Sequence, residues 1–231
     1  MKKDIEKEFE EYKKFIDDKM SSNKIDFNNE NVKLLLGKSI VLIHLTDCIS
    51  ETSGMVQFKH YFMQVEEAVL KFILFFPMQE RIALSTYLRV SIESILKLML
   101  SVSKQENGFE NTGYSVLKEE LKTMEIYHEE KDLLDNLFEK FSNMSKTLHA
   151  KGGSVDIISS LNKFLYTDLE KDVLVEYIKC IDFIIEGMIY LLSIHHNDLS
   201  TSQMLRLERL ISKKKLRHIK RNSNILSESI S

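Results

Sequence analysis

The chain of 231 residues has no tryptophan, a single proline, Pro77, and only seven glycines. Proline and glycine interrupt helices, and Leu, Ile, Lys, Glu and Met are plentiful, so this composition predicts an almost wholly helical chain. No segment alternates apolar and polar residues as a strand does. We therefore expect an all-α protein built as an antiparallel helical bundle.

Cysteine is also scarce. Cys48 and Cys180 are isolated and form no CxxC motif, which argues against a disulfide scaffold and against a structural zinc site. The chain has no P-loop, no dinucleotide-binding glycine fingerprint and no nucleophile elbow. Glu125 and His128 have the Glu-x-x-His spacing of di-iron bundles, but such bundles need two copies of this motif. We expect no metal and no cofactor.

Neither sign of charge dominates, because 32 Lys and Arg face 35 Asp and Glu for a formal net charge of -3. The chain as a whole is therefore not a polyanion binder by bulk charge. The first residues, MKKDIEKEFEEYKK, lack the apolar core of a secretory signal. Charges interrupt the most apolar runs before they reach the length of a membrane-spanning helix. We expect a cytoplasmic protein with no membrane segment.

Apolar residues recur at helical spacing along most of the chain. The pattern predicts helices over 3–20, 31–48, 55–76, 79–102, 114–124, 128–149, 167–195 and about 200–215. Those over 55–76, 79–102, 128–149 and 167–195 are expected at the centre. We divide the chain into an N-terminal amphipathic helix (1–22), a helical-bundle domain (23–198) and a basic helical tail (199–231). The narrow apolar seam of 3–20 needs a surface to pack on, which favours a homodimer or a partner complex.

The helix over 79–102 carries a polar stripe within an apolar segment. Its members recur every four residues: Ser85, Arg89, Glu93 and Lys97. One interpretation is a surface ion pair of small energetic value. The other is a cleft in which this stripe faces the end of the helix over 128–149, whose stretch FSNMSKTLHAKGG contains Ser142, Ser145, Lys146 and His149. A histidine at a helix end is also explained by the helix dipole.

Two other polar groups have alternative explanations. His44 lies in an apolar helix, and we interpret it as a hydrogen-bonded core histidine rather than a ligand. Asp182 and Glu186 are four residues apart, so they are either paired carboxylates for acid–base chemistry or part of an exposed stripe. We favour the exposed stripe.

The segments YLRVSIESILKLML and FSNMSKTLHAKGG resemble a pattern of the HEPN-like helical proteins of bacterial defence and toxin-type systems. The resemblance covers roughly residues 55–195. It implies a helical fold, and a metal-independent endoribonuclease site in which His149 activates the RNA 2′-hydroxyl or protonates the leaving group. The family's arginine would stand at 142, 143 or 144, and those positions are Ser142, Asn143 and Met144. Arg89 is the residue that can supply the cation instead, with Glu93 beside it.

The end of the chain is strongly basic. Between Arg206 and Arg221, eight Lys or Arg face one Glu, and such clusters are typical of phosphate-binding patches. The candidate nucleic-acid contacts are Lys213, Lys214, Lys215, Arg217, Lys220 and Arg221. The alternative is a solvated terminal helix. Aromatic residues are absent from 200–231, which disfavours base stacking.

These patterns leave two functional hypotheses. The first is a HEPN-like protein that acts on or through RNA, with catalytic candidates His149, Arg89 and Glu93 and substrate-binding candidates Ser142, Ser145 and Lys146. The second is a catalytically silent helical subunit that docks a partner protein. The expected partners are a second copy of the chain or another defence-system protein, and RNA through the basic tail.

Overall fold

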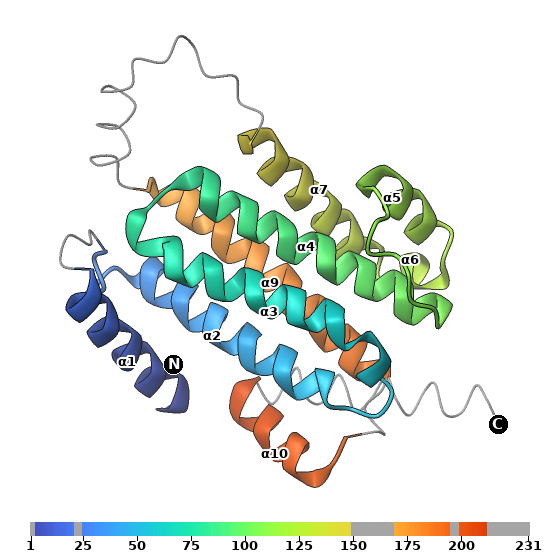
Figure 1. The fold of residues 1–231 in the computed structure, drawn as a ribbon, viewed down its shortest axis with the longest axis horizontal. Coiled ribbons are helices and arrows are strands. Elements are labelled where there is room, and N and C mark those ends of the chain that lie inside the picture. Colours follow the sequence, from blue (N-terminus) through green and yellow to red (C-terminus); the bar gives the residue numbers. More distant parts are fainter. Residues whose placement is uncertain (1–2, 21–24, 149–168, 195–198, 212–231) are drawn as a thin grey trace.

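A computed structural model describes residues 3–20, 25–148, 169–194 and 199–211, with the side chains of 147 and 148 left out (Figure 1). Within these ranges every regular element is a helix, which confirms the predicted all-α class. The bounds are α1 Lys3–Lys19, α2 Glu30–Ser50, η1 Val56–Phe58, α3 Lys59–Phe75, η2 Phe76–Met78, α4 Arg81–Lys104, α5 Tyr114–Lys122, α6 Glu125–Glu129, α7 Lys131–Leu148, α9 Lys171–Ile194 and α10 Thr201–Leu210. No described helix is long and apolar enough to cross a membrane.

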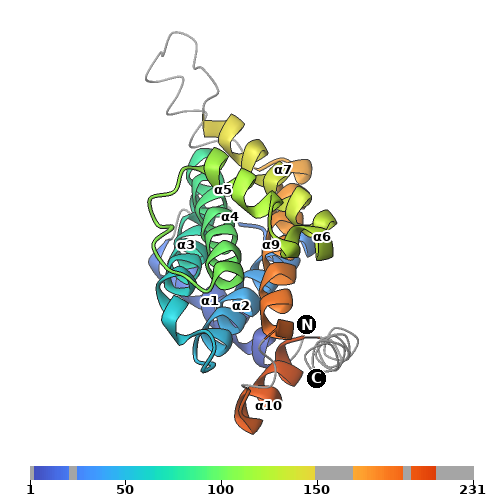
Figure 2. The same ribbon diagram turned by 90° about the vertical axis from the view of Figure 1, so that its right-hand side faces the viewer.

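Helix α4 lies at the centre of the packing. It contacts α3, α7, α9 and α5, while α2 contacts α3 and α9. Figure 2 shows α3 and α4 on one side of the molecule and α7 and α9 on the other. Apolar residues at helical spacing explain this position, because the face of α4 that carries Leu84, Leu88, Ile92 and Ile95 is completely buried.

Helix α9 approaches α4 closely at a glycine. An ideal Cβ on Gly187 would lie 2.9 Å from Met99 Cε and 3.2 Å from Ile95 Cγ1. Both distances are shorter than ordinary carbon–carbon contact, so the absence of a side chain at this position lets the two helices meet. Gly187 is therefore a packing residue of the core.

Apolar residues recur by four and three along the helix expected over 55–76. All of them are buried, in η1, α3 and η2: Phe58, Phe62, Val65, Val69, Phe72 and Phe76. As expected from Pro77, α3 ends nearby, at Phe75, and the proline lies in the short 3-10 helix η2. Gln79 then adopts a left-handed backbone with φ of 54°. The Glu80 side chain accepts from the amides of Ile82 and Ala83 and so caps α4.

The apolar seam of α1 is covered by its own chain. Ile5, Phe9 and Ile16 are buried, and the Tyr12 hydroxyl donates to the backbone oxygen of Ile73 at 3.0 Å. Helix α1 packs mainly on α2. The narrow seam therefore does not by itself require a second chain, and this reason for expecting a partner falls away.

Most expected boundaries differ from the structure by a few residues, and three of the differences concern the second half of the chain. The helix expected over 128–149 is divided in two, because Glu130 leaves helical geometry (φ -122°, ψ 40°) between α6 and α7. Helix α9 begins at Lys171 rather than 167, and Thr167 and Asp168 lie outside the described residues. Helix α10 ends at Leu210, short of the expected 215.

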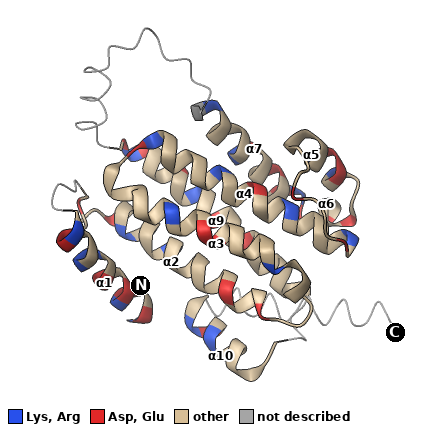
Figure 3. Cartoon of the chain, in the orientation of Figure 1, with Lys and Arg blue, Asp and Glu red and all other residues tan. Residues whose placement is uncertain are grey.

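Charge lies mostly on the outside of the bundle. Figure 3 shows both signs interspersed along α1 and long uncharged stretches on the central helices. One exception is Lys140 of α7, whose side chain is only 8% exposed and whose Nζ donates to Glu176 Oε1 of α9 at 2.9 Å. Such a pair links two helices through charge rather than through apolar contact.

Candidate functional site

The first residue of the polar stripe on α4 is structural. Ser85 is buried, and its hydroxyl lies 3.0 Å from the Tyr177 hydroxyl of α9. The Tyr177 hydroxyl also donates to the backbone oxygen of Arg81 at 3.2 Å. Burial raises the pKa of Tyr177 to about 12, so this phenol stays protonated at neutral pH. The group joins α4 to α9 and does not face a reaction site.

Arg89 packs against α7. Its guanidinium carbon lies 4.8 Å from the centroid of the Phe141 ring, a cation–π contact. Its Nη2 lies 3.9 Å from Glu93 Oε2, and the side chain is 34% exposed. The Nε is buried and has no hydrogen-bond partner within the described ranges. Arg89 is thus held in place by a ring and a carboxylate, with part of the guanidinium open to solvent.

Glu93 and Lys97 anchor the loop between α4 and α5. Lys97 Nζ lies 2.9 Å from Glu93 Oε1 and donates to the backbone oxygen of Glu110 at 2.7 Å. The Lys97 side chain is only 9% exposed. Glu93 consequently faces one cation with each carboxylate oxygen. This geometry favours a structural role for Glu93 over proton transfer.

The end of α7 meets this stripe at Phe141. The Phe141 ring also stacks on Tyr114, with centroids 3.7 Å apart and planes 11° from parallel. The Ser145 hydroxyl donates to the backbone oxygen of Phe141 at 2.9 Å, whereas Ser142 and Lys146 are exposed. The structure therefore brings Arg89 to the turn of α7 that carries Ser142 and Ser145.

Several candidate residues lie outside the described part of the chain. These are His149 and the six basic residues of the tail, Lys213, Lys214, Lys215, Arg217, Lys220 and Arg221. The described part of the cluster offers one partly exposed guanidinium for an anion. The HEPN-like resemblance assigns proton transfer to His149, and this stays a prediction.

Other polar residues singled out from the sequence have structural partners. His44 is hydrogen-bonded, as expected, because its Nε2 lies 2.8 Å from Glu8 Oε1 of α1. It is only partly buried, with 27% of the side chain exposed, so it is not a residue of the core. Asp182 pairs with Lys38 of α2 and is 35% exposed, and Glu186 is exposed. This placement agrees with the exposed stripe rather than with a catalytic pair. In the described ranges no group of three His, Cys, Asp or Glu side chains is placed to hold a metal ion.

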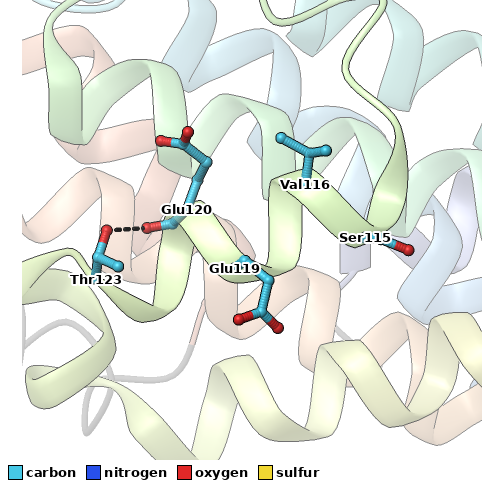
Figure 4. Close-up of a pocket in the computed structure, with 5 residues that line it drawn as sticks. All are labelled: Ser115, Val116, Glu119, Glu120 and Thr123. Atoms are coloured by element: carbon cyan, nitrogen blue, oxygen red, sulfur yellow. Dashed lines mark hydrogen bonds between the residues drawn. The ribbon is translucent and has the colours of Figure 1, made fainter.

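A surface depression of about 450 Å³ lies along α5 (Figure 4). It is lined by Ser115, Val116, Glu119, Glu120 and Thr123. Its two carboxylates are engaged, Glu120 by Lys104 and Glu119 by Lys122 at 3.6 Å. Figure 4 shows the Thr123 hydroxyl bonded to the backbone oxygen of Glu120. These side chains do not form a catalytic set.

The helical hairpin of α3, η2 and α4 exposes apolar side chains. Among the described residues it holds six of the twelve exposed large apolar side chains: Met63, Leu70, Leu74, Met78, Ile82 and Val90. Three of these share one line along α3, since Met63, Leu70 and Leu74 are seven and four residues apart. The Phe75 and Tyr87 rings lie 5.5 Å apart. In antiparallel helices this contact places Val90 of α4 about level with Phe72 of α3, in the same stretch of the hairpin as Leu70 and Leu74.

We name Met63, Leu70, Leu74 and Val90 the α3–α4 face. The central position expected for the helix over 55–76 does not predict this exposed row. A signal was available, because Met63, Leu70 and Leu74 stand where an amphipathic helix would place polar residues. An apolar row on the solvent side of a helix indicates an interaction surface.

Comparison of the chain with protein-family models, with curated proteins and with solved structures gave no match. The HEPN-like resemblance therefore stays a prediction, and the functional argument depends on the contacts described above.

Proposed function

We propose that this chain is a helical docking subunit that binds a protein partner through the α3–α4 face. The observation that carries this proposal is the row of exposed apolar side chains on α3. Met63 is 58% exposed, Leu70 48% and Leu74 45%. Covering a Leu or Met side chain is worth about 1.5–3 kcal/mol when it is fully removed from water, so a partner helix would gain from this row.

The interior of the molecule supports the same proposal. Ser85, Glu93 and Lys97, three of the four residues in the polar stripe of α4, are engaged with Tyr177, Arg89 and the loop before α5. Side chains whose polar groups already bond to other parts of the protein are poorly placed to act on a substrate. The α3–α4 face, in contrast, is not needed to close the core.

Site-specific photo-crosslinking tests the proposal. The full chain is produced in its native cells with p-benzoylphenylalanine at position 70, irradiated, and analysed for covalent protein adducts. The matched control places the same group at Leu34 of α2, a leucine of nearly equal exposure (47% against 48%). A protein adduct at 70 and none at 34 is expected. Absence of any protein adduct at 70, or equal adducts at both positions, would overturn the proposal.

The second candidate function is action on RNA. In this case the chain would be a HEPN-like protein of a bacterial defence or toxin-type system, and if active it would be a metal-independent endoribonuclease. The specific observation in its favour is Arg89. Its guanidinium is partly exposed beside the turn that carries Ser142 and Ser145, and Lys146 is exposed on the following turn. A cation there can stabilise the charge that develops on a scissile phosphate.

The test of this second candidate follows RNA integrity and thermal stability together in His149→Ala and Arg89→Ala. Loss of cleavage with an unchanged melting temperature supports the enzyme. If the parent protein does not cleave RNA and Arg89→Ala lowers the melting temperature, the cluster is structural and the nuclease hypothesis fails.

A further inference from the structure

We infer that the occupant of the α3–α4 face is a second copy of this chain, with the two α3 helices packed antiparallel about a twofold axis beside Val69. This inference rests on the proposed docking function and names its partner. Isologous association of this kind requires a surface that is complementary to itself. The Glu67–Lys71 charge pair on α3 has that property.

The apolar row of α3 is interrupted by one charge pair. Lys71 Nζ donates to Glu67 Oε1 at 2.6 Å, and both side chains are exposed. Glu67 and Lys71 lie at equal distances on either side of Val69. An antiparallel pairing centred there sets Glu67 against the partner's Lys71, and the reciprocal contact forms at the same time. The two ion pairs within the helices can then extend into a four-charge network across the interface.

The same axis matches the apolar residues. Met63 and Leu74 lie almost symmetrically about Val69, so each Met63 meets the partner's Leu74 at either end of the contact. The two copies of Leu70 lie next to each other at the centre. The residues Met63, Glu67, Leu70 and Leu74 are spaced by four, three and four, which is the spacing of a helix–helix seam.

Other occupants fit less well. A parallel pairing would set Glu67 against Glu67 and Lys71 against Lys71 of the two copies, which is repulsive. Nucleic acid requires a surplus of cations, and on this row the one lysine is neutralised by its glutamate. An antiparallel second copy satisfies both the apolar row and the charge pair, and a different protein captured at this face is an outcome of the test.

Sedimentation velocity on the full chain at tens of micromolar is the first measurement. A dimer is expected, and Leu70→Glu/Leu74→Glu should weaken the dimer by about 100-fold or more, since four leucines in the interface become charged. The far-ultraviolet circular dichroism of the variant should be unchanged. Leu34→Glu, the control, should remain dimeric. A monomeric parent, or a dimer that survives the double substitution, would overturn the inference.

Charge exchange tests the pairing. Glu67→Lys and Lys71→Glu should each weaken the dimer, because each places like charges opposite each other. The double variant Glu67→Lys/Lys71→Glu restores opposite charges at every contact and should restore the dimer. No rescue by the double variant would contradict the antiparallel arrangement.

Engineered cysteines test the geometry, and the native Cys48 and Cys180 are buried and do not interfere. In the antiparallel pair, Leu70→Cys should cross-link to its own copy, and Met63→Cys/Leu74→Cys should cross-link between copies. Met63→Cys alone should not, since the two sites would lie about 18 Å apart along the helices. Cross-linking of Met63→Cys alone would indicate a parallel pair and refute the inference.

These outcomes separate the two proposals. If the photo-crosslinker at Leu70 captures a different protein while the purified chain sediments as a monomer, the self-association fails and the docking function stands. If no protein is captured and the chain is a monomer, both fail.

Discussion

Removing the carboxylate from the Lys140–Glu176 pair should destabilise the fold more than removing the ammonium. The two side chains differ in exposure, with 8% for Lys140 and 30% for Glu176. A carboxylate at 30% exposure can recover water when its partner is lost. An ammonium at 8% exposure cannot, and a buried charge without a partner is costly.

The structure sets the expected size of this asymmetry. Glu176→Met leaves Lys140 with Glu139, 3.5 Å away and itself 62% exposed. Breaking a buried pair costs about 3–5 kcal/mol, and because Glu139 remains we expect a loss of about 2–3 kcal/mol. Lys140→Met should cost less than about 1 kcal/mol, since an apolar chain of similar size fills the site. The double variant should resemble Lys140→Met, with a coupling energy of about 2 kcal/mol.

Urea unfolding followed by circular dichroism gives the four free energies of unfolding. Equal losses for Glu176→Met and Lys140→Met would refute the reasoning. A pH series adds a second check. Burial lowers the pKa of the Lys140 amine, but the hydrogen bonds and charges of Glu176 and Glu139 together raise it above its ordinary value of 10.5. From neutral pH up to 10.5 the contribution of the pair is therefore complete, and it is lost as the pH rises through the raised pKa of Lys140, a loss that Lys140→Met should lack.

Three further outcomes follow from the packing. Gly187→Leu should lower the free energy of unfolding by about 2 kcal/mol or more, because a Cβ there already lies 2.9 Å from a side-chain atom of α4; an unchanged urea midpoint would contradict this. Burial raises the pKa of Cys48 to about 11 and that of Cys180 further, so a thiol reagent near neutral pH should label neither until the protein is unfolded. In α10, Leu207→Ala should remove more hydrogen-exchange protection than Arg206→Ala. Leu207 is completely buried, whereas the exposed ion pair of Arg206 is worth about 0–1 kcal/mol. The reverse order would show that the ion pair, rather than apolar burial, holds this helix in place.

Helical periodicity predicted those parts of the fold that depend on short-range spacing. The core face of α3, its end near Pro77 and the long α4 all follow from which residues share one side of a helix. The break at Glu130 was missed, because the apolar seam of α7 continues with little visible change through the preceding residues. Local backbone geometry at one residue, without a glycine or proline, leaves no clear mark in the sequence.

The contacts that each side chain makes with other helices and loops were harder to predict than the helices themselves. A four-residue spacing shows only that side chains share a face of α4, as do Ser85, Arg89, Glu93 and Lys97. Whether Lys97 meets solvent or the backbone of Glu110 depends on how the loop before α5 crosses that face. The burial of Lys140 depends in the same way on the approach of α9. These contacts arise from tertiary packing, which no local pattern encodes.

The polar stripe of α4 and the apolar row of α3 have similar spacing, but they differ in how far the rest of the fold covers them. The polar stripe of α4 looks like a reaction site in the sequence, yet α9, α7 and the loop before α5 take up most of its groups. The apolar row on α3 looks like an extension of the core, yet no described helix covers Met63, Leu70 or Leu74. A group that the fold has already satisfied adds stability, whereas an apolar group left in water lowers free energy only when something binds it. This difference is the reason for proposing a binding function for α3. The catalytic hypothesis depends on Arg89, the one member of the α4 stripe that keeps a third of its side chain in solvent.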